Sequence, residues 1–217
     1  MLERMEEFFN NRAETYEEHM MNNVVGADKY YAETAKLIPK DRGVEILDLG
    51  CGTGLEIDEI LKINPDVNIT AIDMAENMVQ KIKEKHVDKM NQINIIVDNY
   101  LNYNFGNGEF DAVVSVESLH HFSHEEKIKL YTKIYNALNR SGIFIDTDYV
   151  APDQEFEDYH YKENAKIRLE SGINSGLYHY DTPCTVENEK KFLLKSGFKH
   201  VEDVWKKGDT AIIVAKK

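Results

Sequence analysis

The sequence is poor in cysteine, proline and long hydrophobic runs. Its 217 residues include only two cysteines, Cys51 and Cys184, and four prolines. Two cysteines so far apart provide neither a disulfide framework nor the spacing of a metal site. No apolar run approaches the roughly 20 residues that a membrane span needs, and the acidic stretch Met1–Glu7 lacks the features of a signal peptide. We therefore expect a cytoplasmic protein in a reducing compartment, with no membrane segment.

Basic residues are also scarce. Lysine and arginine together number 26 against 39 acidic residues, which gives a net charge of −13. Proteins that bind nucleic acids usually carry a basic face that neutralises phosphates, and the lysines and arginines here form no dense block. This charge disfavours nucleic acid as a partner and favours a small molecule. The chain length fits one α/β domain, which we expect to be a monomer or homodimer.

The most informative stretch runs from Glu45 to Leu55 and joins a short apolar strand to a glycine turn. The strand covers Glu45–Leu49, and the glycines stand at positions 50, 52 and 54, directly before a helix predicted over Glu56–Ile63. Glycines let the backbone approach a ligand closely, and the amides at a helix start suit a polar or anionic group. The pattern therefore predicts a ligand-binding corner.

The spacing of the glycines argues against a pyrophosphate ligand. The third glycine arrives one residue earlier than in the dinucleotide-binding turn. Asp48 stands just before the turn, where its carboxylate could accept hydrogen bonds from an ammonium group. An ordinary glycine turn in another α/β domain remains the alternative.

Acidic residues end three consecutive predicted strands. Asp48 lies in the first, Asp73 ends Asn68–Asp73, and Asp98 ends Ile93–Asp98. The carboxyl ends of parallel strands line one crevice, so these acids should converge there. Asp73 follows the turn at about the spacing of an acid that binds ribose hydroxyls, although a helix N-terminal acid favoured by the dipole would look the same.

The run Asp48-Leu49-Gly50-Cys51-Gly52-Thr53-Gly54 resembles motif I of the class I S-adenosylmethionine-dependent methyltransferases. The resemblance implies a Rossmann-like three-layer α/β sandwich with a seven-stranded, mostly parallel sheet and an antiparallel last strand. It also implies S-adenosylmethionine as cofactor and methyl transfer as the reaction. Asp48 and the glycine backbone would hold the methionine end, Asp73 the ribose, and Asp98 with Asn99 the adenine. The implied cofactor site consists of Tyr16, Asp48, Gly50, Cys51, Gly52, Asp73, Met74, Met78, Asp98, Asn99 and Val116.

The N-terminal 40 residues are predicted to be mostly helical. Phe9, Ala13 and Tyr16 match a Phe-x-x-x-Ala-x-x-Tyr segment that forms a lid over the cofactor in many small-molecule methyltransferases. The alternative is a pair of amphipathic helices that only covers the edge of the sheet.

The segment after the predicted strand Phe110–Val116 contains candidates for a general base. Glu117 and His120 could both border the pocket, and the sequence does not choose between them. His120, His121 and His124 are close in sequence, but adjacent histidines in a turn cannot easily share one ion and no other ligand cluster is evident. We therefore predict no metal site. Asn139–Gly142 is expected to end the following helix before a strand over Ile143–Asp148.

Residues 149–185 interrupt the alternation of strands and helices. They are rich in tyrosine and histidine, and we predict a helix over Glu155–Glu170 and a loop over Tyr178–Pro183 that together cover the substrate. The tyrosines Tyr149, Tyr178 and Tyr180 are the expected substrate contacts. A surface helix with snorkelling tyrosines is the alternative.

The predicted organisation is one domain over residues 1–217. It comprises a helical lid (1–40), a cofactor-binding core (41–148), the substrate cover (149–185), and a C-terminal helix with a hairpin (186–217). The expected activity is methyl transfer to a small-molecule acceptor. Two alternatives stay open: a carboxymethyl-adenosylmethionine synthase of tRNA modification, which has a similar tail, and a non-catalytic adenosylmethionine-binding protein. Two cysteines do not supply the thiolates of an arsenite methyltransferase.

Overall fold

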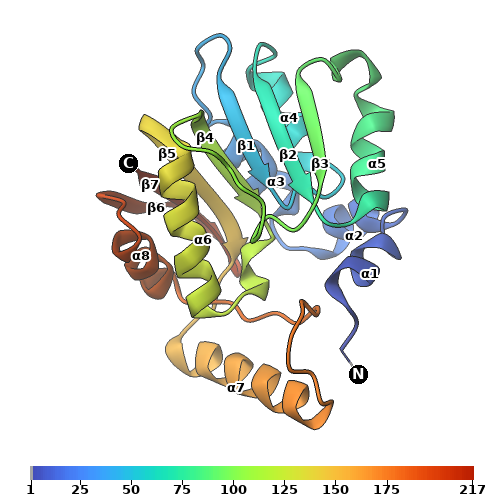
Figure 1. The fold of residues 1–217 in the computed structure, drawn as a ribbon, viewed down its shortest axis with the longest axis vertical. Helices are drawn as coiled ribbons and strands as arrows, with labels where there is room; N and C mark the ends of the chain where they lie inside the picture. The colour runs from blue at the N-terminus through green and yellow to red at the C-terminus, as the bar shows by residue number, and fades with distance from the viewer. Residues whose placement is uncertain (1) are drawn as a thin grey trace.

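A seven-stranded sheet forms the centre of the computed structural model, which describes residues 2–217 (Figure 1). Met1, the first residue of the expected lid, lies outside the described residues. The strand order is β3-β2-β1-β4-β5-β7-β6. The strands are β1 Glu45–Leu49, β2 Asn68–Asp73, β3 Ile93–Val97, β4 Phe110–Val116, β5 Leu138–Tyr149, β6 His200–Lys207 and β7 Thr210–Lys216.

Strands β1 to β5 pair in parallel, and β7 runs antiparallel to both of its neighbours, β5 and β6. This confirms the predicted α/β class with its antiparallel last strand. The predicted C-terminal hairpin is also confirmed: β6 and β7 pair antiparallel, and Gly208 and Asp209 form the turn between them.

Helices cover both faces of the sheet (Figure 1). The helices are α1 Met5–Asn10, α2 Tyr16–Asn23, α3 Ala27–Ala35, α4 Leu55–Ile63, α5 Glu76–Lys85, α6 His124–Ala137, α7 Gln154–Glu170 and α8 Val186–Lys195. None of these helices, within the described residues 2–217, is both long and apolar enough to cross a membrane.

Alternating residues of the buried strands supply two hydrophobic cores, one on each face of the sheet. Ile46 of β1 packs in the core beneath α3, α4 and α5. Its neighbour Leu47 packs in the opposite core, with residues of α6 and α8. A strand residue and the next one point to opposite faces, so a strand covered on both sides must be apolar at consecutive positions. This explains the apolar run that marks β1 in the sequence.

The junction between α6 and β5 differs from the prediction. Ser123 forms a capping box with Glu126 at the start of α6. The expected break at Asn139–Gly142 does not occur, because β5 begins at Leu138, directly after α6. Leu138 is buried and pairs with Phe110, and the Asn139 side chain donates to Asp111. Contacts with β4 therefore hold this stretch in an extended conformation. The pairing of β4 with β5 shifts register between Phe110 and Ala112.

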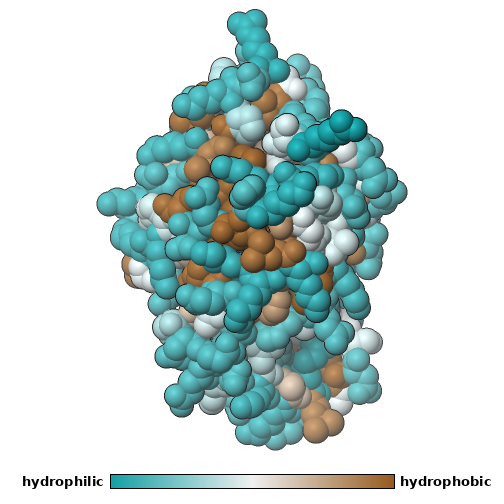
Figure 2. Space-filling model, turned by 90° about the vertical axis from the view of Figure 1, so that its left-hand side faces the viewer, coloured by the Kyte–Doolittle hydropathy of each residue, from teal (hydrophilic) through white to brown (hydrophobic). Residues whose placement is uncertain are grey.

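Strand β6 forms one edge of the sheet. Figure 2 views the molecule from this side, where a largely hydrophilic surface is interrupted by hydrophobic residues near its middle. Val204 of β6 and Leu194 of α8 are both exposed hydrophobic residues. Charged residues at positions 202, 203, 206 and 207 of β6 accompany Val204, and charges on an edge strand discourage pairing with another chain.

Candidate functional site

The glycine turn after β1 is tied to the end of β2 by hydrogen bonds. The Gly50 amide donates to the Ile72 carbonyl at 2.8 Å, and the Gly52 amide donates to Asp73 Oδ2 at 2.9 Å. Gly50 has φ +76°, and a Cβ atom there would lie 2.1 Å from Ser118 Oγ. The Ser118 hydroxyl is itself held 2.7 Å from Tyr100 Oη. Glycine is therefore required at position 50 by both backbone conformation and space.

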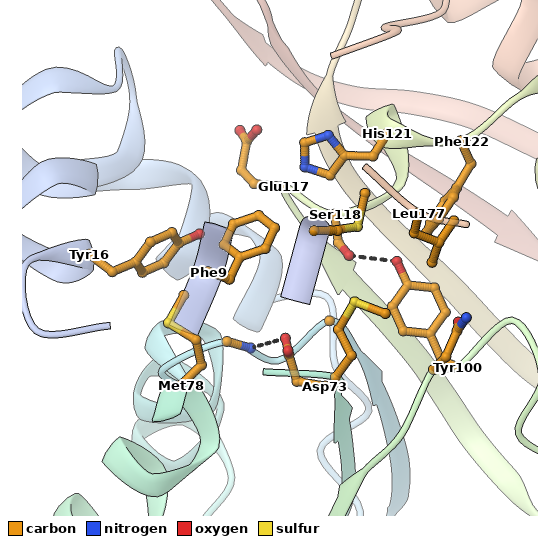
Figure 3. Close-up of a pocket in the computed structure, with 15 residues that line it drawn as sticks. Phe9, Tyr16, Asp73, Met78, Tyr100, Glu117, Ser118, His121, Phe122 and Leu177 are labelled. Carbon is orange, nitrogen blue, oxygen red and sulfur yellow. Dashed lines mark hydrogen bonds between the residues drawn. The ribbon is translucent and has the colours of Figure 1, made fainter. Parts of the chain in front are cut away.

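A narrow cavity, here called the corner cavity, opens above this turn (Figure 3). Of the expected cofactor residues, its lining includes Tyr16, Gly50, Gly52, Asp73, Met74, Met78 and Asn99. The other lining residues are Met5, Phe9, Tyr100, Glu117, Ser118, His121, Phe122 and Leu177. The Asp73 carboxylate, backbone amides and thioether walls are suited to a ribose and a base, so the residues present fit the adenosine part of the expected cofactor.

Asp73 is the acidic group at the centre of the corner cavity. Its Oδ1 accepts from the Ala75 amide at 2.8 Å, in addition to the bond from Gly52 to Oδ2. Burial raises the pKa of Asp73, and these backbone amides oppose the rise. Asp73 therefore shapes the glycine turn, holds the amide of Ala75 just before α5 and lines the cavity.

Asp48, Cys51, Asp98 and Val116 are absent from the cavity lining. Asp48 is fully buried behind the turn beside Glu56. Burial raises the pKa of Asp48 to about 7 and that of Glu56 well above its ordinary value. Asp98 is exposed, and its Oδ1 accepts from the amide of Asn99.

The sequence predicts that all three strand-end acids converge on the ligand, and in the structure their side chains occupy different places. Cys51 and Val116 are buried in the hydrophobic core. Asp48 turns inward because its strand is covered on both faces, and Asp98 lies beyond the last residue of β3. Of the three acids, only Asp73 reaches the cavity.

A second, larger cavity of about 600 Å³ adjoins the corner cavity. Phe9, Tyr16, Glu117 and His121 line both. The remaining lining residues of this large cavity are Phe8, Arg12, Thr15, His19, Met20, Asn23, Val24, Val25, His120, Tyr149, His179, Asp181, Asp209 and Thr210.

Glu117 lies where the two cavities meet, immediately after β4. It is the only non-glycine residue among residues 2–217 with a positive φ, +50°, and such strained residues tend to occur at functional sites. Its Oε1 accepts from the Thr210 hydroxyl at 3.0 Å. Burial raises the pKa of Glu117 to about 7, and the nearby His120 opposes this rise.

Three histidines surround one oxygen of Asp181, and these four residues are called the histidine–aspartate cluster below. Asp181 Oδ1 lies 3.2 Å from His121 Nδ1, 3.7 Å from His120 Nε2 and 3.8 Å from His179 Nε2. His120 Nδ1 lies 2.6 Å from Asp148 Oδ1. Thr182 holds the segment that carries Asp181 against His120, since both its amide and its hydroxyl donate to the His120 carbonyl.

The electrostatics of the cluster separate the two adjacent histidines. Burial disfavours a charged His120, but Asp148, together with Asp181 and Glu117, outweighs burial and raises the pKa of His120 to about 9. Burial and the charge of His120 lower the pKa of His121. Sequence reasoning missed Asp181, His179 and Asp148, because these residues are distant in the chain. For Asp148, the sequence offered one signal: it lies near the carboxyl end of a strand, where ligand sites of parallel sheets are found.

The expected substrate contacts are only partly placed at the cavities. Tyr149 lines the large cavity, whereas Tyr178 and Tyr180 line neither. The segment is extended there, so alternate side chains point in opposite directions. Leu177, His179 and Asp181 therefore face the cavities, and Tyr178 instead lies under the Arg168 guanidinium.

The N-terminal segment closes one side of both cavities. The Met5 amide donates to the Leu177 carbonyl at 3.1 Å, and the His179 amide donates to the Glu3 carbonyl at 3.0 Å. The Phe8 ring stacks on His179 with 3.5 Å between centroids. Two segments that are far apart in the sequence therefore form one wall of the cavities.

Comparison with known proteins agrees with this geometry. Residues 46–142 match the family described as "Methyltransferase domain". Carboxy-S-adenosyl-L-methionine synthase from Campylobacter fetus is 25% identical over 185 residues, which cover 80% of this chain and 77% of that protein. Phosphoethanolamine N-methyltransferase from Plasmodium falciparum is 30% identical over 159 residues, which cover 72% of this chain and 54% of that protein.

A solved structure shows the same fold. Phosphoethanolamine N-methyltransferase 2 from Haemonchus contortus, in complex with S-adenosyl-L-methionine, has a TM-score of 0.69 at 20% identity and covers 92% of this chain. The match covers 44% of that protein and 54% of the Plasmodium enzyme, so it spans about half of each phosphoethanolamine enzyme. Family match, sheet order and glycine corner agree: the chain carries a class I S-adenosylmethionine-dependent methyltransferase domain and is an enzyme that uses this cofactor.

Proposed function

We propose that the enzyme transfers a methyl group from S-adenosylmethionine to a small-molecule acceptor held in the large cavity. The observation that carries this proposal is the meeting of the two cavities at Glu117, Tyr16, Phe9 and His121. A cofactor in the corner cavity would have a direct path to an acceptor only at this junction. The cavity volume of about 600 Å³ is within the usual size range of small-molecule sites.

The residues of the corner cavity would bind and orient the cofactor. Asp73 would accept hydrogen bonds from the ribose hydroxyls, and Met74 and Asn99 would flank the adenine. The bound cofactor supplies an electrophilic methyl group on a sulfonium. Transfer then depends mainly on placing the acceptor in line and keeping water out. The N-terminal segment, through Phe9 and Tyr16, would act as the lid that excludes water.

Glu117 is the better placed of the two candidate bases. It lines both cavities, whereas His120 lines only the large one. The His120 Nδ1 atom is also engaged with Asp148. A proton leaving the acceptor at the junction would therefore meet the Glu117 carboxylate first.

The similarity to carboxy-S-adenosyl-L-methionine synthase supports a second candidate function. A carboxylated sulfonium substituent would require a cation near the junction. Among residues 2–217, Arg12 is the only lysine or arginine that lines either cavity, and its guanidinium pairs with Glu3 and lies over Phe8. Glu117 and Asp181 would instead repel a carboxylate. The lining therefore favours transfer of an unmodified methyl group.

The proposal is tested with cofactor carrying a labelled methyl group and a metabolite extract fractionated by size. We expect adenosylhomocysteine to form and the label to appear on a small molecule, identified by mass spectrometry. Glu117→Gln should abolish most of the transfer, while Asp98→Ala, outside the cavities, serves as the matched control. Formation of a carboxylated cofactor would establish the second function, and transfer of label only to macromolecules would contradict the proposal.

A further inference from the structure

The histidine–aspartate cluster has an arrangement that hydrogen bonding does not explain. The Oδ1 atom of Asp181 and the Nδ1 atom of His121 are both buried, and within residues 2–217 neither makes a well-directed hydrogen bond, although the two atoms lie 3.2 Å apart. The His121 side chain is only 4% exposed. Leaving such buried polar atoms unpaired is costly, so the cluster is incomplete as it stands.

The distances within the cluster match those between ligands of one metal ion. Ligand atoms about 2.0–2.2 Å from a zinc ion lie roughly 3.3 Å from one another in a tetrahedral site. The three nitrogen atoms lie 3.2, 3.7 and 3.8 Å from Asp181 Oδ1. One ligand atom each from His120, His121 and Asp181 all lie within 4.8 Å of one another. Adjacent histidines can therefore face the same point, contrary to the expectation from the sequence.

The surroundings of His120 also have the form of a metal site. A histidine that binds a metal through one ring nitrogen usually donates its other N–H to a carboxylate or carbonyl. Asp148 occupies that position, with its Oδ1 2.6 Å from His120 Nδ1. This leaves Nε2 directed toward Asp181, at 3.7 Å.

A second cluster of possible ligands lacks these features. His124, Glu157 and Cys184 are close enough to share an ion. The oxygens of Glu157, however, already accept from the Thr185 amide and the Asn188 side chain, and the Cys184 thiol contacts the Tyr161 hydroxyl. His124 Nε2 is the one ligand atom of this group, within residues 2–217, that has no well-directed hydrogen bond, and it lies 2.9 Å from Glu157 Oε1.

We propose that the histidine–aspartate cluster binds one divalent transition metal ion on the wall of the large cavity. His120, His121 and Asp181 supply three ligands, His179 lies beside them, and solvent from the cavity completes the coordination. Imidazole nitrogens with a single carboxylate suit zinc or iron(II), whereas magnesium prefers an all-oxygen set. All four residues line the large cavity, so an ion there faces the space assigned to the acceptor. Binding of the ion requires neither cofactor nor acceptor.

The first test measures metal binding directly. The full chain is freed of metal with a chelator and titrated with Zn²⁺ by calorimetry, with Mg²⁺ titrated in parallel. We expect one Zn²⁺ per chain and much weaker binding of Mg²⁺. Co²⁺ in place of Zn²⁺ should give the intense visible absorption of a four- or five-coordinate site. Absence of stoichiometric Zn²⁺ binding, or a Co²⁺ spectrum like that of the free aqueous ion, overturns the proposal.

Variants locate the site. Asp181→Asn and His121→Gln should each weaken Zn²⁺ binding by more than the roughly 10–100-fold that loss of an outer partner causes, and Asp148→Asn should fall in that range. His200→Ala removes an exposed histidine of β6 and is the matched control. Wild-type affinity in both ligand variants would overturn the site. Asp148→Asn removes no ligand, and it repeats the test if a ligand variant fails to fold. Adenosylhomocysteine titrated into the metal-free protein reports on the methyltransferase proposal independently.

Discussion

The corner cavity and the large cavity meet at shared residues but are built differently. Many polar groups of the corner cavity, Asp73 among them, lie at the carboxyl ends of β1, β2 and β3 or on the turns after them, and Glu117 and His121 join them from the segment after β4. The large cavity draws its acids and histidines from α2, the segment after β4, the segment 177–181 and the turn before β7. Cofactor recognition is thus a local property of the chain, whereas acceptor recognition depends on residues brought together by folding.

The largest expected effect concerns Asp73 and tests the corner cavity. Asp73→Ala would remove two charge-assisted hydrogen bonds to the ribose, each contributing roughly 1.5–3 kcal/mol. We expect affinity for adenosylhomocysteine to fall by about 100-fold or more, as measured by calorimetry. The melting temperature should also fall, because Asp73 accepts from Gly52 and Ala75.

Asp98→Ala is the matched control, since this acid also follows a strand but lies outside both cavities. Its affinity for adenosylhomocysteine should stay within about two-fold of wild type, well below the tenfold that 1.4 kcal/mol represents. Equal losses in the two variants would mean that the lining residues do not define the cofactor site.

Gly50→Ala should give the next largest effect. The new Cβ would meet Ser118 Oγ at 2.1 Å and Ser118 Cβ at 2.7 Å, so rotation of the serine cannot relieve the clash. Overpacking of this kind costs roughly 1–3 kcal/mol, and we expect that loss in chemical denaturation together with weaker cofactor binding. Gly108→Ala is the control: it has a similar φ, +69°, but nothing within 4 Å. A loss as large in Gly108→Ala would attribute the effect to backbone strain alone.

Tyrosine substitutions test the large cavity. Tyr149→Ala should lower methyl transfer by about 10-fold, because Tyr149 lines the cavity and positioning of the acceptor lowers the barrier. Tyr178→Ala should leave transfer near the wild-type rate, since this residue faces away. Turnover with labelled cofactor measures both, and adenosylhomocysteine affinity should be unchanged in each. A larger loss in Tyr178→Ala would restore the expectation drawn from the sequence.

The smallest expected effect concerns the anchor of the segment that carries Asp181. Burial opposes ionisation of Glu157, but His124, Thr185 and Asn188 outweigh it and lower its pKa to about 2. Because this pKa lies below that of the unfolded chain, the stabilisation is complete above about pH 4.3 and is lost as the pH falls toward 2. Glu157→Gln should therefore melt at a lower temperature at pH 7, by an amount that shrinks on acidification. A difference that does not depend on pH would contradict the ionised state of Glu157.

Much of the fold followed from the sequence because its signals are local. The bounds of β1, β2 and β4 were predicted as observed, since apolar runs, glycines and acids mark them directly. The junction before β5 was not, because contacts with Asp111 and Phe110 across the sheet override a turn-like sequence.

The candidate site divides in the same way. Gly50, Gly52, Asp73 and Asn99 line the corner cavity as expected, whereas Asp48 has the expected sequence context but points into the interior. Nothing near His120 in the sequence indicates Asp181, because the two residues are distant in the chain. They meet in the folded protein, where the Thr182 amide donates to the His120 carbonyl. The direction of Tyr178 depends on the phase of an extended segment, which its sequence does not specify.

The most direct test of the account is a crystal structure with adenosylhomocysteine bound. We predict the ribose at Asp73, the adenine between Met74 and Asn99, and the sulfur directed toward Glu117 and the large cavity. A ligand bound elsewhere, or one whose sulfur points away from the large cavity, would contradict the claim that the two cavities exchange a methyl group at Glu117.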